Sequence, residues 1–300
     1  MFEGFTQELI DTGEATISVR YAGSGPPILL LHGFPQSSAM WHQQAPALAQ
    51  THTVVLTDLR GYGDSSKPRS DSSHAAYSFR AMAADQLAVM RHLGFERFAV
   101  VGHDRGARVA HRLALDHPDA VNRLGLIDIL PTGYMYDTVD SALATAYFHW
   151  FLFIQPEPLP ERLIAGDPIG FLHALLGGWG SGLEAYAPAA LAEYERVFLD
   201  AVARHAMLED YRAAASIDLE HDLADTGRRI EVPTLIMWGG RSVVGRRPVD
   251  PITVWQQYVV SPQATVIDGG HFLVEECPGE TLMALQGFLS PKNPPEGPVT

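Results

Sequence analysis

The stretch RFAVVGHDRGA, residues 97–107, places a short apolar run directly before an aspartate that stands among glycines. The apolar run predicts a buried strand. Gly102 and Gly106 lie two positions before and after Asp104, and such small residues permit a sharp turn from the strand into a helix that begins near Ala107. A turn of this kind lifts the central side chain above the sheet. Taken alone, the pentapeptide also fits an aspartate that caps a helix N-terminus.

Similar apolar runs recur along the chain, with helical stretches between them. The runs lie at residues 16–23, 26–33, 52–63, 97–104, 121–130, 232–240 and 263–270. The helical stretches lie at residues 82–94, 108–118 and 280–289. Because continuous Val, Leu and Ile runs between helices are typical of strands buried on both faces, we predict an α/β fold with a mostly parallel central sheet flanked by helices.

The segment from Pro131 to about Thr226 breaks this pattern, because it is rich in aromatic residues and alanine and has helical periodicity. We therefore predict a main domain made of residues 1–131 and 226–300, with a helical cap domain, residues 132–225, inserted into it. A cleft is expected between such parts, near the carboxyl ends of the strands. The Pro-rich tail, SPKNPPEGPVT, is expected to fray.

Composition narrows the classes of function. The 300 residues are 46% hydrophobic and 19% charged, which indicates a substantial core. A net charge of −14 disfavours binding to nucleic acid. No apolar run reaches the ~18 residues of a membrane span, and the N-terminus lacks the basic and apolar parts of a signal peptide. Cys277 is the single cysteine, which fits the cytoplasm. A small-molecule enzyme is the expected class.

Motifs for metals and nucleotide cofactors are missing from the sequence. It has no HExxH, no paired CxxC, no GxGxxG and no P-loop. We therefore predict an enzyme without a metal or a cofactor.

Two further segments favour a catalytic role for the turn at Asp104. The run at 26–33 leads into Phe34, whose backbone N–H can form an oxyanion hole with that of Arg105. His271 follows the last predicted strand, and the two glycines before it let its loop approach the turn.

The third member of the site is predicted from the cost of burying a charge. Asp128 lies within an apolar strand and needs a partner there, for which a histidine N–H is suitable. Asp250 is the first acid after the run at 232–240, and we interpret it as a loop residue. The predicted catalytic set is therefore Asp104, Asp128 and His271.

An aspartate at the centre of the turn suits displacement at a saturated carbon. Its attack forms an alkyl ester that water can hydrolyse at the carboxyl carbon, whereas a serine would form an ether. Asp104 therefore indicates either dehalogenation or epoxide opening. With HGFP at 32–35, DLRGYGDS at 58–65 and GHDRGA at 102–107, the sequence resembles the aspartate-nucleophile branch of the α/β-hydrolase family. That resemblance implies the α/β-hydrolase fold.

Arg105 and Arg108 distinguish the two chemistries. In dehalogenases and epoxide hydrolases of neutral substrates, the position after the nucleophile is usually Trp. Two arginines on one helix face can instead hold a carboxylate and keep Asp104 ionised. They would also offset the repulsion between two anions, about 4 kcal/mol at ~4 Å and an effective dielectric constant of ~20. The alternative is that both arginines pair with acids on the helix surface.

Three longer segments are similar to the fluoroacetate and haloacetate dehalogenases. They are residues 102–121, 148–164 and 210–222. This resemblance implies that Arg105 and Arg108 bind the substrate carboxylate, that His149, Trp150 and Tyr211 bind the halide, and that the protein is a homodimer. Imidazole, indole and phenol groups are all hydrogen-bond donors, as a departing fluoride requires. Without the resemblance, His149 and Trp150 would fit aromatic core packing, and Tyr211 would fit an ordinary amphipathic helix.

The sequence therefore predicts hydrolysis of a small anionic substrate, a haloacetate, to glycolate and halide. An epoxide hydrolase using the same Asp104, Asp128 and His271 is the first alternative. The second is a non-catalytic small-molecule binding protein, which would require the catalytic set to be vestigial.

Overall fold

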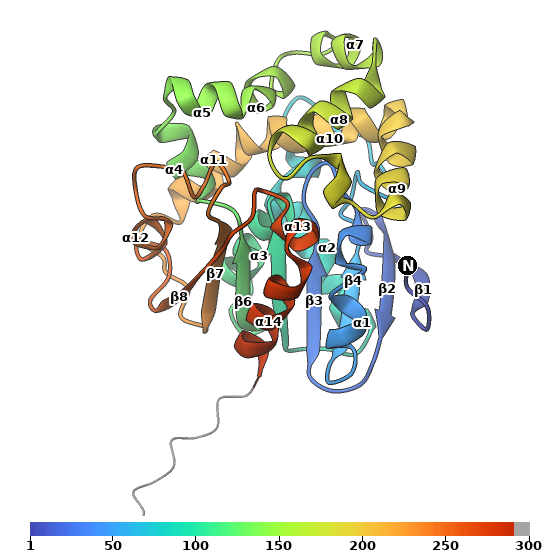
Figure 1. The fold of residues 1–300 in the computed structure, drawn as a ribbon, viewed down its shortest axis with the longest axis vertical. Coiled ribbons are helices and arrows are strands. Elements are labelled where there is room, and N and C mark those ends of the chain that lie inside the picture. Colours follow the sequence, from blue (N-terminus) through green and yellow to red (C-terminus); the bar gives the residue numbers. More distant parts are fainter. Residues whose placement is uncertain (291–300) are drawn as a thin grey trace, which may run out of the picture.

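The structure is a computed structural model that describes residues 1–290, and its centre is one eight-stranded sheet (Figure 1). The strands are β1 (Thr6–Asp11), β2 (Thr16–Ala22), β3 (Pro27–Leu31), β4 (Thr53–Thr57), β5 (Phe98–His103), β6 (Val121–Ile127), β7 (Thr234–Gly239) and β8 (Pro262–Ile267). Their order is β1-β2-β4-β3-β5-β6-β7-β8. Every neighbouring pair from β4 to β8 is parallel, and β2 is antiparallel to both of its neighbours. The predicted mostly parallel sheet is confirmed.

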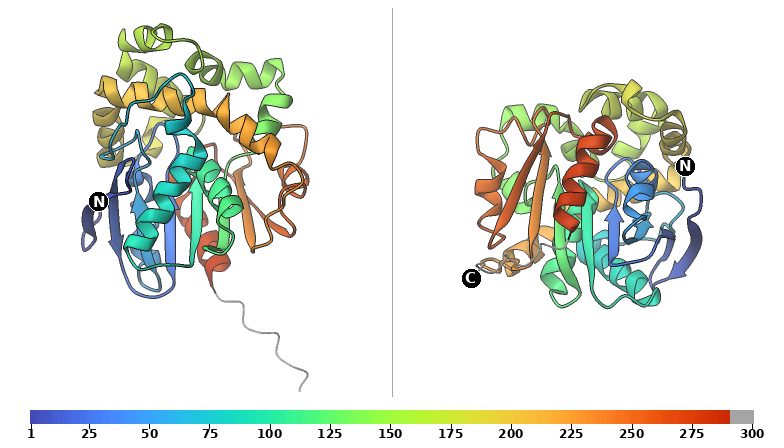
Figure 2. Two further views of the ribbon diagram at one scale, coloured as in Figure 1. Left: turned by 180° about the vertical axis from the view of Figure 1, so that it is seen from behind. Right: turned by 60° about the horizontal axis from the view of Figure 1, so that its bottom comes forward.

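Helices cover both faces of the sheet (Figures 1 and 2). The helices of this layer are α1 (Ala45–Leu48), α2 (Phe79–His92), α3 (Arg105–Asp116), α12 (Pro251–Trp255), α13 (Leu273–Glu276) and α14 (Pro278–Leu289). The helices α2 and α3 pack together on one face, and α1 and α14 lie on the other. The strands between them are continuous apolar runs because both of their faces are buried, as at Leu29–Leu31.

Eight helices between β6 and β7 gather beyond one end of the sheet, at the top of Figure 1. They are α4 (Thr132–Asp137), α5 (Ser141–Ala146), α6 (Phe148–Phe153), α7 (Leu159–Ala165), α8 (Pro168–Gly178), α9 (Pro188–Leu199), α10 (Ala201–Ala214) and α11 (Ile217–Ala224). They lie beyond the carboxyl ends of β5 and β6, so the residues that follow these two strands face them. Three short 3-10 helices, at Ser38–Trp41, Ala75–Tyr77 and Leu183–Ala185, complete the helical elements of the described residues.

One element of the described chain differs from expectation, and one expectation lies outside the described residues. The sequence analysis did not predict β1, an edge strand with mostly polar and exposed residues that carries no apolar run. The Pro-rich tail from residue 291 onward lies outside the described residues. Within residues 1–290, no helix combines the length and the apolar character needed to cross a bilayer.

Candidate active site

The turn between β5 and α3 holds Asp104 in a left-handed backbone conformation, with φ 46° and ψ −115°. A Cβ atom added to Gly102 would overlap the carbonyl oxygen of Gly106, and one added to Gly106 would overlap that of His32. Glycine is therefore the residue that fits at both positions. The predicted strand–turn–helix is present, and α3 begins at Arg105, two residues earlier than expected. Left-handed backbone at a non-glycine residue is costly and is concentrated at functional sites.

Asp128 also has a positive φ, of 53°, directly after β6. Its Oδ2 atom lies 2.6 Å from His271 Nδ1. Its Oδ1 atom accepts hydrogen bonds from the Gly239 N–H at 3.0 Å and the Ser242 hydroxyl at 2.6 Å. The buried carboxylate is therefore fully partnered and fixes the orientation of the imidazole ring. Sequence reasoning placed Asp128 with His271 but missed Ser242.

His271 is buried with only 3% of its surface exposed, and its loop is held from two sides. Its N–H donates to the Trp179 carbonyl at 2.8 Å, and its carbonyl accepts from His103 Nε2 at 2.8 Å. Burial lowers the pKa of His103 to about 3, so His103 is neutral and serves as a donor. Burial would also lower the pKa of His271, but the hydrogen bond and charge of Asp128, together with the charge of Asp104, raise it above 6.5.

The carboxylate of Asp104 meets one of the two predicted oxyanion donors. The backbone N–H of Phe34 donates to Asp104 Oδ2 at 3.0 Å. The backbone N–H of Arg105 makes no hydrogen bond to Asp104 in the described part of the chain. Burial alone would raise the pKa of Asp104, but His271 and the guanidinium groups of Arg105 and Arg108 lower it below its ordinary value. Asp104 is therefore an ionised carboxylate at neutral pH, as a nucleophile must be.

Arg105 is wholly buried and is held by an acid that the sequence analysis did not identify. Its Nε atom donates to Asp210 Oδ2 at 2.9 Å, and its Nη2 atom donates to Asp210 Oδ1 and to the Asp210 carbonyl. The Tyr62 hydroxyl donates to the same carboxylate at 2.7 Å. The guanidinium carbon lies 4.3 Å from the Tyr211 ring centre and 4.7 Å from that of Phe79. Arg105 therefore pairs with an acid in the protein interior and not, as in the alternative reading, on the helix surface.

Arg108 is fixed in a different way. Its Nη1 atom donates to the Thr132 hydroxyl at 2.8 Å and to the Leu130 carbonyl at 3.1 Å, and its guanidinium carbon lies 4.9 Å from the Trp150 ring centre. No ion pair holds Arg108 within residues 1–290. Burial and the neighbouring Arg105 lower the pKa of the Arg108 guanidinium group.

Each of the two arginines has a buried guanidinium nitrogen whose hydrogens lack an acceptor among the described residues. These nitrogens are Nη1 of Arg105 and Nε of Arg108. Buried donors are usually satisfied, so these two nitrogens are available to an acceptor from outside the protein. A small carboxylate between the two guanidinium groups would provide that acceptor.

The three predicted halide-binding residues come together from α6 and α10. The ring centres of His149 and Tyr211 are 5.5 Å apart, and those of Trp150 and Tyr211 are 6.3 Å apart. The Phe34 ring stacks on His149 at 5.9 Å, which places this group beside the oxyanion donor. Burial lowers the pKa of His149 well below 6.5, so its ring is neutral and keeps one N–H donor.

Asp250, interpreted as a loop residue, is exposed and makes no hydrogen bond to Asp104, Asp128 or His271 among the described residues. Its carboxylate accepts from the Ile252 N–H at 3.0 Å and caps the N-terminus of α12. Sequence reasoning missed Asp210 and Thr132. The signal available for Asp210 was its position next to Tyr211 in a segment already singled out.

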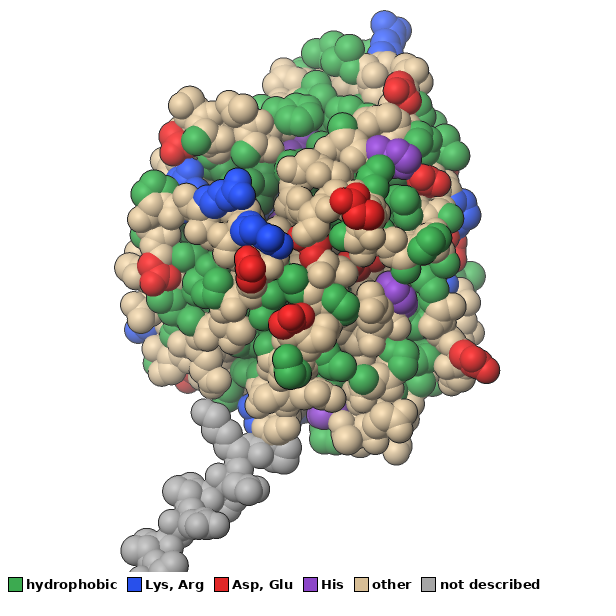
Figure 3. Space-filling view, in the orientation of Figure 1, with side chains coloured by type: hydrophobic (Ala, Val, Ile, Leu, Met, Phe, Trp, Pro, Cys, Tyr) green, Lys and Arg blue, Asp and Glu red, His purple; other side chains and the backbone are tan. Residues whose placement is uncertain are grey.

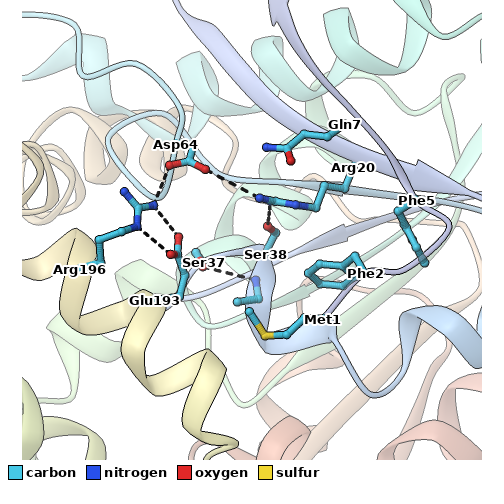
Figure 4. A pocket seen from close by; sticks show the side chains of 11 residues that line it. Met1, Phe2, Phe5, Gln7, Arg20, Ser37, Ser38, Asp64, Glu193 and Arg196 are labelled. Carbon is cyan, nitrogen blue, oxygen red and sulfur yellow. Dashed lines mark hydrogen bonds and ion pairs between the residues drawn. The ribbon is translucent and has the colours of Figure 1, made fainter.

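A separate cavity of about 480 Å³ lies between the N-terminal segment and α9 (Figure 4). Its charged side chains are already paired. Arg196 of α9 binds Asp64 at 2.6 Å and Glu193 at 2.7 Å, and Arg20 donates to the Ser38 hydroxyl at 2.9 Å. The contact between Arg196 and Asp64 joins α9 to the loop after β4, so we assign this cavity a structural role.

The fold and the site together define a hydrolase. Its aspartate, Asp104, stands in the strand-to-helix turn, at the position from which such a turn presents a nucleophile. The chain belongs to the alpha/beta hydrolase fold family, whose model matches residues 26–278. A "Fluoroacetate dehalogenase" of Burkholderia sp. is 47% identical to it over 97% of this chain and 95% of that protein. A "Soluble epoxide hydrolase" of Corynebacterium sp. (strain C12) is 32% identical over 90% of this chain and 92% of that protein. The crystal structure of a "putative alpha/beta hydrolase" from Nostoc sp. PCC 7120 superposes with a TM-score of 0.95. Its sequence is 52% identical to this one, and the match covers 97% of this chain and 99% of the Nostoc chain.

Proposed function

We propose that this protein is a haloacetate dehalogenase, of the fluoroacetate type, that hydrolyses a 2-haloacetate to glycolate and halide. The observation that carries the proposal is the pair of buried arginines beside Asp104, each with an unpaired N–H group. A neutral substrate gives these groups no charged acceptor, whereas a carboxylate does. The similarity to the Burkholderia fluoroacetate dehalogenase supports the same substrate class.

In the first step, Asp104 displaces the halide. Because the Phe34 N–H already binds Oδ2, Oδ1 is the oxygen free to attack the carbon that bears the halogen. The new bond joins Oδ1 to that carbon, and the carbon–halogen bond breaks with its electron pair going to the halide. Arg105 and Arg108 hold the substrate carboxylate and reduce the repulsion between the two anions.

The departing halide needs hydrogen-bond donors, above all when it is fluoride. His149, Trp150 and Tyr211 supply one N–H or O–H each, from rings that pack against one another next to Phe34. These donors act where negative charge develops in the transition state, so they lower the barrier to bond cleavage.

In the second step, water hydrolyses the ester. His271 accepts a proton from water as the water attacks the carboxyl carbon of Asp104, and Asp128 stabilises the imidazolium ring. The oxyanion forms on Oδ2, where the Phe34 N–H lies and where we place the Arg105 N–H in this state. The bond between the carboxyl carbon and Oδ1 then breaks, so glycolate leaves with the original Oδ1. One haloacetate and one water give glycolate, halide and a proton.

A single turnover in heavy-oxygen water tests this route. The label is expected in Asp104 and not in glycolate, because water attacks the enzyme's carboxyl carbon. Label found directly in the first glycolate would reject the ester intermediate. Halide release from fluoroacetate and chloroacetate, followed with ion-selective electrodes, tests the activity itself, and a non-catalytic binding protein would release none.

Epoxide hydrolysis is the second candidate, because the Corynebacterium epoxide hydrolase is also similar over most of the chain. The two functions differ in their dependence on Arg108. For a haloacetate, Arg108→Met is expected to reduce kcat/KM by about 100-fold or more, since a charged hydrogen-bond partner is lost. For a neutral epoxide, the same change is expected to have little effect. Normal turnover of epoxides by the Arg108→Met variant would favour the second candidate.

We further propose that residues 132–225 act as a cap domain over the site, because His149, Trp150 and Tyr211 come from α6 and α10. The resemblance to haloacetate dehalogenases also leads us to propose a cytoplasmic homodimer. Exposed apolar residues on the cap helices, such as Leu159, Leu163 and Val202, support an interface there. Sedimentation equilibrium and cell fractionation test these two points.

A further inference from the structure

A groove of about 730 Å³ opens beside the active site and contains a cluster of positive charge. Its walls are α5 and the start of α6, the segment after α8, and the loop that follows β7. Three arginines of that loop line it: Arg241, Arg246 and Arg247. Asp140 is the acid among its lining residues. Figure 3 shows Lys and Arg side chains gathered on this face of the molecule, between the regions of α5 and β7.

The groove shares a wall with the catalytic site. Trp179 and Gly270 both line it. Gly270 directly precedes His271, whose N–H donates to the Trp179 carbonyl at 2.8 Å. The Trp179 ring centre lies 4.3 Å from that of His149 and 5.9 Å from that of His271. One residue layer therefore separates the groove from both the proposed base and the proposed halide site.

The three arginines differ in how fully they are neutralised. Arg246 is exposed and makes no ion pair within residues 1–290. Arg241 lies 3.6 Å from Asp268, and the side chains of both are at least half exposed, so solvent weakens the pair. Arg247 is nine-tenths buried. It contacts Asp140 at 3.3 Å and the Thr138 carbonyl at 2.8 Å, and its Nε atom is buried without an acceptor in the described chain.

A positive groove is unusual on a protein whose net charge is −14. At physiological salt, charges beyond about 8 Å are largely screened, so an anion near the groove responds to the local arginines more than to the distant acids. A cleft lined by charges of one sign raises the local concentration of the opposite ion.

We propose that this groove is an anion-binding vestibule that collects small carboxylates next to the catalytic site. The proposal rests on the proposed haloacetate substrate, because a neutral substrate would gain nothing from the cluster. Arg246 is the main anion-binding side chain, since it is the least neutralised of the three.

Kinetics at low ionic strength test the vestibule. Arg246→Gln is expected to raise KM for haloacetate about fivefold, and Arg246→Glu more, with the difference from wild type fading as salt is added. The matched control is Arg91→Gln. Arg91 is also exposed but pairs with Glu96 beyond the opposite ends of the strands, and KM is expected to stay at the wild-type value. An unchanged KM in both Arg246 variants would overturn the proposal.

A second measurement needs no turnover. Iodide, an anion, and acrylamide, which is neutral, both quench tryptophan fluorescence on contact, and the Trp179 contribution is the difference between a protein and its Trp179→Phe variant. Arg246→Glu is expected to lower iodide quenching of Trp179 about fivefold or more while acrylamide quenching stays constant. Equal iodide quenching with and without the substitution contradicts the vestibule. Failure of the wild-type protein to release halide contradicts the proposed function instead, so the two results are separable.

Discussion

Asp210 lies directly against Arg105, with 2.9 Å between Arg105 Nε and Asp210 Oδ2 and neither side chain exposed to solvent. The pair leaves only Nη1 of Arg105 without a partner. The acid therefore orients the guanidinium group, and the arginine offers the substrate only its Nη1 amino group. Two cations near Asp104 would repel each other, and Asp210 reduces that repulsion.

Replacing this acid tests whether it positions Arg105. Asp210→Asn presents an NH₂ group to a guanidinium and leaves a buried cation without its counter-charge, so we expect a loss of about 3–5 kcal/mol in the free energy of unfolding. We also expect kcat/KM for haloacetate to fall at least tenfold. Thermal unfolding and steady-state kinetics measure the two effects. The control is Asp222→Asn, which removes a more exposed partner of Arg112 and should leave kcat/KM close to wild type. Full activity in Asp210→Asn would show that Arg105 does not depend on this contact.

Removing His271 should separate the two chemical steps. In His271→Ala, Asp104 can still form the ester, but no base activates water, so the intermediate is expected to accumulate. Intact-protein mass spectrometry after incubation with haloacetate should show the added carboxymethyl group. The double variant Asp104→Asn, His271→Ala is the control and should gain no mass. Normal turnover in His271→Ala would remove this residue from the second step.

The fold was predictable from sequence where burial imposes a pattern, and not elsewhere. The strands β3 to β7 are apolar runs because both faces of the sheet are covered, whereas β1 is a mostly exposed edge strand and gave no such signal. Asp128 could be placed because a carboxylate inside an apolar strand requires a partner. That requirement is local and visible in the sequence.

Contacts between distant segments could not be derived in the same way. Asp210 is 105 residues from Arg105, and nothing in an amphipathic helix identifies which of its acids turns inward to meet a particular arginine. Ser242 and Thr132 are similar cases, since hydroxyl groups in loops and at helix starts are common. Their roles follow from the packing of the α4–α11 helices and the β7 loop against the sheet.

Thr132 provides a test of how Arg108 is held. Its hydroxyl accepts from Arg108 Nη1 at 2.8 Å, and the Leu130 carbonyl accepts from the same atom. Thr132→Val keeps the shape but removes one acceptor from a charged donor, a loss of about 1.5–3 kcal/mol for such bonds. Because Arg108 would contact the carboxylate both before and during reaction, we expect KM to rise about tenfold with a smaller change in kcat. Thr226→Val, at an exposed position, is the control. A change confined to kcat would contradict a binding role for Arg108.

Glu275 gives a prediction about pH and stability. It is 3% exposed, accepts from the Tyr194 hydroxyl at 3.0 Å and from Gln36 Nε2, and lies beside Glu276. Burial, with a smaller contribution from Glu276, raises its pKa from 4.5 to about 8, although its two hydrogen bonds oppose the change. The folded protein therefore holds a proton between pH 4.5 and 8 that the unfolded chain releases. The free energy of unfolding should fall as pH rises through that range, by up to about 1.4 kcal/mol per pH unit from this group.

Glu275→Gln isolates this contribution, because glutamine is neutral at every pH and similar in shape. The difference in unfolding free energy between variant and wild type, measured by urea denaturation from pH 5 to 8, should move in favour of the variant as pH rises. Glu280→Gln, on the exposed side of α14, should give a difference that does not change with pH. Parallel pH curves for wild type and Glu275→Gln would mean that Glu275 is already ionised in the folded protein. Gln36 follows Phe34 by two residues and Glu275 follows His271 by four, so this hydrogen bond joins the two segments that carry the oxyanion donor and the base.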